Sequence, residues 1–75
     1  MTPERRIERV RDLIEDVAAD PNRFDELSPG ERLIVGIAMD RIDLLQGDGI
    51  SSIEQAQDRL APEWITAIRA ATQGV

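Results

Sequence analysis

Apolar residues recur along the chain at the three- and four-residue spacing of amphipathic helices. This spacing predicts helices over about residues 3–19, 29–46, 52–60 and 63–73, with the last two short. We therefore expect an all-α fold, a compact four-helix bundle-like domain with the second helix at its centre. No second domain is visible, so residues 1–75 are expected to form a single helical domain.

The stretch over residues 29–46 is the longest apolar-rich segment, and it carries helix signals at both ends. Ser28 and Glu31 have the spacing of a capping box, and Pro29 suits the first helical position. Gly47 is free to take the left-handed conformation that ends many helices. On a helical wheel, apolar side chains cover most of the circumference, so we expect neighbours on several sides. The polar strip of that wheel consists of Arg32, Gly36, Asp40 and Asp43.

Arg41 interrupts the apolar arc of this central helix. In one interpretation its aliphatic stem covers apolar surface while the guanidinium reaches solvent. In the other it forms a partly buried ion pair with a carboxylate of another helix or of a partner. The first is favoured because charged residues are rarely fully buried.

The first helix combines one apolar stripe with a densely charged opposite face. Thr2 is a plausible N-cap, and Pro3 suits the first helical position. Three ion pairs are expected along this helix, namely Glu8–Arg11, Arg9–Asp12 and Arg11–Glu15.

The remaining segments carry weaker signals. Residues 20–27 are expected to form a turn that places Phe24 and Leu27 in the core. Ser51 and Glu54 repeat the capping-box spacing at the start of the third helix, and Gly74 is expected to end the fourth.

The composition excludes much of enzyme chemistry. The chain contains no histidine, cysteine, tyrosine or lysine, which removes the usual general base, thiolate, phenol and Schiff-base amine. Asp40, Asp43 and Asp48 do not follow the spacing of a calcium loop. We expect a non-enzymatic protein without cofactor or metal. Short, charge-interrupted apolar runs and an N-terminus unlike a signal peptide indicate a cytoplasmic protein that does not contact a membrane.

The formal net charge of −6 argues against direct nucleic-acid binding, since phosphate contacts come from lysine and arginine. It favours attraction to a basic partner. Asp40, Asp43 and Asp48 gather near the end of the central helix and, with Glu31, form a candidate acidic strip. The predicted partner-binding residues are Glu31, Asp40, Arg41, Asp43, Asp48 and Trp64.

Two further observations bear on partners. Trp64 is the only tryptophan, and we favour a core position with one exposed edge over a binding hot spot. The central helix has apolar side chains that point in several different directions, among them Val35, Met39 and Leu44. Three other helices do not easily cover all of these directions. Uncovered apolar surface on a small chain indicates a partner or a homodimer.

The sequence thus favours a non-catalytic protein-interaction module. Its acidic surface would dock on a basic, nucleic-acid-binding surface of a larger protein, as a phage-encoded anti-CRISPR-type inhibitor would. The alternative is a helix-turn-helix DNA-binding regulator using residues 52–73. Against that alternative, the turn carries Ala61-Pro62 instead of glycine, and Arg69 is the only basic residue of the second helix.

Overall fold

A computed structural model describes residues 2–73, and every regular element in this range is helical. The α-helices are α1 (Pro3–Ala19), α2 (Pro29–Ala38), α3 (Ile53–Asp58) and α4 (Pro62–Gln73), and the 3₁₀ helices are η1 (Pro21–Glu26) and η2 (Ile42–Asp48). The all-α prediction is confirmed. The expected helix end at Gly74 lies outside the described residues.

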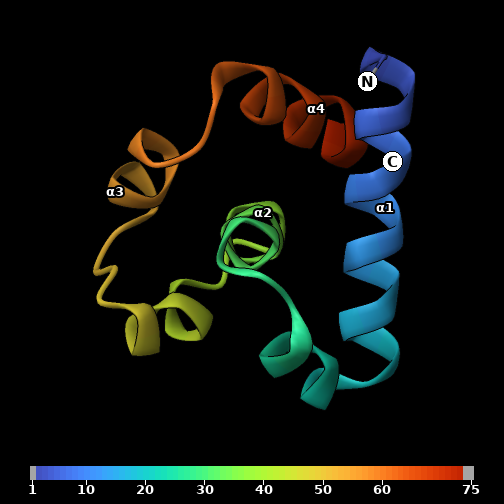
Figure 1. Cartoon of the computed structure of the whole chain (residues 1–75). Helices are drawn as coiled ribbons and strands as arrows, with labels where there is room; N and C mark the ends of the chain where they lie inside the picture. Colours follow the sequence, from blue (N-terminus) through green and yellow to red (C-terminus); the bar gives the residue numbers. More distant parts are fainter. Residues whose placement is uncertain (1, 74–75) are drawn as a thin grey trace.

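The chain winds around α2, which Figure 1 shows end-on at the centre of the molecule. α2 packs against α1, η2, α3 and α4, while α4 packs mainly against α1. The long α1 crosses the direction of α2 instead of running beside it (Figure 1). The result is a compact globule of six helical segments in the described range, and the four-helix bundle is not confirmed.

α1 has the predicted boundaries. The Thr2 hydroxyl accepts the Arg5 N–H at 3.3 Å, and Pro3 occupies the first turn. The inner stripe of Val10, Leu13 and Val17 is buried against α2 and α4. None of the three predicted ion pairs along this helix is present among the described residues.

α2 is shorter than predicted, because it ends at Ala38 and not near residue 46. The Arg41 N–H donates to the Gly36 carbonyl at 2.9 Å, and the Asp40 N–H donates to the Ile37 carbonyl at 3.2 Å. Asp40 between them has a positive φ of 53°. These two bonds and the left-handed residue form a Schellman motif, which ends the helix and reverses the chain.

The chain then folds back as η2, which ends at Gly49 with φ 80°. The Ile50 N–H donates to the Leu45 carbonyl at 3.3 Å, and both side chains are buried. The left-handed position predicted at Gly47 therefore lies two residues later. Burial of Leu45 and Ile50 together accounts for the shift, because apolar contact across such a motif stabilises it.

Gly36 explains how η2 can lie so close to α2. A Cβ at this position would lie only 2.6 Å from the Cγ and Cδ1 atoms of Leu45, which is fully buried. The Leu45 side chain thus rests directly on the α2 backbone. Gly36 belongs to the strip that the wheel marks as polar, and it is buried instead of solvent-facing.

Arg32 joins three consecutive segments. Its guanidinium donates to the Asp25 carbonyl at 2.9 Å and to the Asp48 carboxylate at 3.3 Å. It also lies over the Phe24 ring, 5.9 Å from the centroid, within the range of a cation–π contact. Phe24 is buried, as predicted, and Leu27 is half-buried. One side chain of α2 therefore holds both η1 and η2.

The N-cap of α3 lies one residue later than predicted, at Ser52 instead of Ser51. The Ser52 hydroxyl accepts the Gln55 N–H at 3.1 Å, and the Gln55 side chain accepts the Ser51 N–H at 3.0 Å. Ser52 and Gln55 thus take the roles predicted for Ser51 and Glu54. Either serine fits the local pattern, and the register that buries Ala56 against α2 is the one that forms.

α4 buries Ala67, Ile68 and Ala71, and small side chains of this kind allow close packing on α1. Across residues 2–73, no helix reaches the length and apolar character needed to cross a bilayer.

The strained turn at Asp40 gives a first testable prediction. Replacing Asp40 with glycine should raise the free energy of unfolding by about 1 kcal/mol, because glycine adopts positive φ without steric cost. The change also removes a negative charge from the C-terminal end of α2, where the helix dipole disfavours it. Urea denaturation followed by circular dichroism measures the difference. Asp40→Ala is the control, since it removes the charge but keeps the strain, and an equal gain from both would contradict the argument.

Candidate partner-binding site

The structure divides the six predicted partner-binding residues among three places. Glu31 and Trp64 line one hollow. Asp40, Arg41 and Asp43 lie at the turn between α2 and η2, whereas Asp48 lies at the far end of η2. Glu31 and Asp40 stand at opposite ends of α2, about 14 Å apart along the helix axis. The acidic residues therefore do not form one continuous strip.

The hollow shared by Glu31 and Trp64, here termed the Trp64 hollow, has a volume of about 280 Å³. It is lined by Arg9 and Leu13 of α1, by Ser28, Gly30, Glu31 and Ile34 at the start of α2, and by Leu60 and Trp64. Leu13 and Ile34 are buried, while Leu60 and Trp64 are half-buried. The expected position of Trp64, packed on the core with part of it exposed, is confirmed.

An ion pair crosses the rim of this hollow. Arg9 of α1 donates to the Glu31 carboxylate, although the two residues lie far apart in sequence. The predicted capping box also forms, since Glu31 accepts the Ser28 N–H at 3.1 Å and the Ser28 hydroxyl accepts the Glu31 N–H at 3.3 Å. The sequence does not indicate Arg9 as a site residue, because its spacing predicts a pair with Asp12 within the same helix.

The same contacts shift the ionisation of Glu31. The Ser28 N–H holds the pKa of the Glu31 carboxyl below its ordinary value of 4.5, and the Ser28 hydroxyl and Arg9 lower it further against the opposing effect of burial. A carboxylate with a lowered pKa in the folded state stabilises the fold above its unfolded pKa. That contribution is lost as the pH falls through the folded-state value.

The pH dependence gives a second prediction. Glu31→Gln should lower the free energy of unfolding by about 1 kcal/mol at neutral pH, the typical net value of one hydrogen bond. The difference from the unmodified protein should begin to shrink as the pH falls below about 4.5, the ordinary pKa of this carboxyl in the unfolded chain. It should be lost once the pH is below the lowered pKa of the folded state. Urea denaturation at a series of pH values measures it. Glu54→Gln, at an exposed position with no ion pair to a described residue, is the control, and a pH-independent loss in Glu31→Gln would contradict the assignment.

Gly30 leaves the hollow open on one side. A Cβ built at this exposed position meets no atom within 4 Å. A side chain placed there would extend into free space at the start of α2, and it would improve the helix propensity of that turn. The site can therefore be altered at Gly30 without disturbing the packed core.

At the α2–η2 turn, Arg41 and Asp43 form an ion pair with each other. Arg41 donates through two nitrogens to the Asp43 carboxylate, at 2.9 and 2.7 Å, and about half of each side chain is exposed. The hydrogen bond from Arg41 lowers the pKa of Asp43 and raises that of Arg41. The favoured interpretation, in which the Arg41 guanidinium reaches solvent, agrees with this exposure. A partly buried pair is not what forms among the described residues, and a pair with a partner stays a prediction. α2 ends before Arg41, so the residue never joins the apolar arc.

Ion pairs within the chain reduce the negative charge that the predicted acidic strip presents to a basic partner. Glu31, Asp43 and Asp48 are paired with Arg9, Arg41 and Arg32. Asp40 is the member of the predicted strip that has no ion pair with a described residue. Most other carboxylates of the chain also form no ion pair within residues 2–73. The excess negative charge is therefore spread over the surface instead of gathered on one strip.

The predicted helix-turn-helix segment has an unfavourable arrangement for DNA. α3 makes its main packing contact with α2, whereas α4 packs on α1 and α2. In a helix-turn-helix the two helices are supported by each other, and the second enters the major groove. Arg69 is the only basic side chain of α4 and is exposed beside two threonines. This geometry does not favour the alternative.

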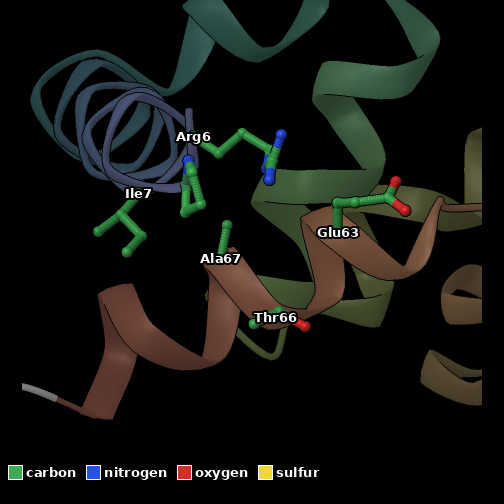
Figure 2. A pocket seen from close by; sticks show the side chains of 6 residues that line it. Arg6, Ile7, Glu63, Thr66 and Ala67 are labelled. Carbon is green, nitrogen blue, oxygen red and sulfur yellow. The ribbon is translucent and has the colours of Figure 1, made fainter. Parts of the chain in front are cut away.

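A smaller hollow of about 210 Å³ lies where α1 passes the start of α4. Figure 2 shows Arg6 and Ile7 extending from α1, with Glu63, Thr66 and Ala67 across from them on α4. One arginine and one glutamate give this hollow no net charge. It is a seam between two packed helices, and no aromatic side chain lines it.

Within the described range, no three carboxylates lie close enough together to hold a metal ion. Comparisons of the chain with protein-family models, with curated proteins and with solved structures give no match.

Proposed function

We propose that the chain is a non-catalytic protein-interaction module that binds a larger protein through the Trp64 hollow. The observation that carries this proposal is the meeting of Trp64 and Arg9 over an apolar floor. Tryptophan and arginine are the residues most enriched at the energetic centres of protein interfaces. A hollow of this kind suits the insertion of one apolar side chain from the partner.

The rim of the hollow is suited to excluding water around such an anchor. The Arg9–Glu31 pair and the Ser28 capping box fix polar groups at its edge, while Leu13, Ile34 and Leu60 supply the apolar contact. Contacts that surround an interface centre and exclude water are typical of tight protein complexes. The rim is preformed in the unbound chain, which reduces the entropy lost on binding.

The net charge of −6 supports a partner with a basic surface. Such a surface commonly binds nucleic acid, so the module would compete with the nucleic acid and act as an inhibitor in the cytoplasm. Anti-CRISPR proteins of phages are one class with this mode of action. Since the unpaired carboxylates are distributed over the surface, we assign the charge a steering role and the Trp64 hollow the specific contact.

A pair of glycine variants tests the proposal. Gly30→Gln places a bulky side chain at the open side of the Trp64 hollow, where it would obstruct an entering group. Gly47→Gln places the same side chain on η2, at an exposed position where a Cβ also meets no atom within 4 Å. The unmodified chain and both variants are used as bait in a nuclease-treated lysate of the native host. The captured protein is identified by mass spectrometry, purified, and its affinity for each bait is measured by calorimetry.

The proposal expects one protein to bind the unmodified chain and Gly47→Gln alike, and to bind Gly30→Gln at least about ten-fold more weakly. Affinity should fall as salt rises if the partner is basic. Equal binding by both variants would exclude the Trp64 hollow as the contact. Recovery of the bait alone would contradict the interaction module itself.

A further inference from the structure

A second apolar surface surrounds Met39, on a different part of the molecule. Two hollows of about 430 and 300 Å³ adjoin there, and Met39 lines both. We term this surface the Met39 face. The larger hollow is lined by Arg11, Ile14, Glu15, Ala38, Met39, Ala71 and Thr72, and the smaller by Val17, Ala18, Pro21, Met39, Arg41 and Leu44. None of these residues lines the Trp64 hollow.

The Met39 face retains apolar side chains that the fold does not cover. Val35, which the sequence grouped with Met39 and Leu44, is fully buried in the core. Met39 and Leu44 are only half-buried, as are Ile14 and Ala38 beside them. A continuous apolar surface of this kind on a small protein marks a place where another molecule packs. Methionine at its centre suits such contact, because its flexible side chain adapts to the opposing surface.

The charges on the rim indicate what packs there. Arg11 and Glu15 lie one turn apart on α1, line the larger hollow and are exposed. Neither forms an ion pair within residues 2–73, although their spacing would allow the two to pair with each other. The smaller hollow is edged by the Arg41–Asp43 pair, which carries no net charge.

We propose that a second copy of this chain covers the Met39 face, with the two copies related by a two-fold axis. In such an interface the same surface of each copy contacts the other. A positively charged residue must therefore lie opposite a negatively charged residue of the second copy, and not opposite its own counterpart. Two α1 helices running antiparallel across the axis place Arg11 of each copy opposite Glu15 of the other. The apolar side chains beside them, Ile14 and Met39, then pack against their counterparts.

A strongly basic partner fits this face less well. One arginine and one glutamate on the rim, with a neutral pair at the other end, leave no local acidic excess for such a partner to neutralise. The size of the chain also favours self-association, because a domain of 75 residues buries a small core by itself. The net charge of −6 on each copy opposes dimer formation, and salt screens that repulsion.

Sedimentation equilibrium of the purified full chain, at several concentrations and ionic strengths, tests the proposal. We expect a monomer–dimer equilibrium whose dissociation constant falls as salt rises from about 0.05 to 0.5 M, since screening reduces the repulsion between like-charged copies. The mass of one chain at every concentration and salt would overturn the proposal.

Charge exchange on α1 identifies the interface. Arg11→Glu and Glu15→Arg should each raise the dissociation constant at least about ten-fold, because like charges then face each other twice across the axis. The double variant, R11E with E15R, should recover self-association. An equimolar mixture of the two single variants should form a heterodimer. Arg11 and Glu15 are both exposed on α1, so circular dichroism should show the same helix content in all three variants.

A second pair of variants tests the apolar part. Ala18→Glu introduces a charge into the smaller hollow from an exposed position, and Ala61→Glu makes the same change at an exposed alanine outside both hollows. Only Ala18→Glu should prevent dimer formation. Gly30→Gln should leave it unchanged, so failure of the dimer and failure of the Trp64 hollow are separate results. A dimer unaffected by Ala18→Glu and by both charge changes would place the interface elsewhere and exclude the Met39 face.

Discussion

Replacing Leu45 with alanine is expected to lower the free energy of unfolding by about 3 to 5 kcal/mol, the largest single effect in this chain. Leu45 is fully buried between η2 and the α2 backbone, and Gly36 has no side chain that could move into the space left behind. A domain of this length has a total stability of about 4 to 11 kcal/mol. The variant should therefore be partly unfolded at room temperature.

Urea denaturation followed by the fluorescence of Trp64, the only tryptophan, measures this loss. Leu33→Ala is the control, because Leu33 lies on α2 but is only half-buried. Its loss should be smaller, about 1 to 2 kcal/mol, in proportion to the apolar area it buries. Equal losses for the two variants would show that the packing of η2 on α2 is not the centre of stability.

Replacing Gly36 with alanine is expected to lower the free energy of unfolding by about 1 to 3 kcal/mol, by overpacking. The new methyl group would lie 2.6 Å from two carbon atoms of Leu45, whose surroundings leave it no room to withdraw. This cost exceeds the gain of about 1 kcal/mol that alanine normally brings to a helix. Gly30→Ala on the same helix, with no atom near its Cβ, should show that gain alone.

The two changes should be strongly non-additive. In the chain carrying both Gly36→Ala and Leu45→Ala, the methyl group added at residue 36 occupies part of the space vacated at residue 45. The combined loss should be smaller than the sum of the single losses, with an interaction energy of about 1 kcal/mol or more. Additive losses in urea denaturation would contradict the direct contact between these two positions.

The boundaries of α1 could be predicted because all signals for it are local. Thr2 and Pro3 start the helix, and one apolar stripe runs its length. The end of α2 could not be predicted in the same way. Apolar spacing continues through Leu45, but the chain reverses at Asp40, a residue that adopts the left-handed conformation less readily than glycine and so gives a weaker stop signal. The reversal is favoured by a tertiary contact between Leu45 and Gly36, and a helical wheel contains no information about it.

The candidate site shows the same division between local and long-range signals. The Ser28–Glu31 capping box was visible in the sequence because its partners are three residues apart. The pairing of Glu31 with Arg9 was not visible, since it depends on how α1 crosses the start of α2. Trp64 stood out by its rarity, but only the fold brings it to the same hollow as Glu31.

The position of Arg32 has a consequence for motion within the folded state. η1 and η2 are short 3₁₀ helices that bury few side chains of their own, and Arg32 binds the Asp25 carbonyl in one and the Asp48 carboxylate in the other. A local opening that withdraws this guanidinium releases both segments at once. η1 and η2 should therefore exchange their amide hydrogens as one cooperative unit, although α2 separates them in the sequence.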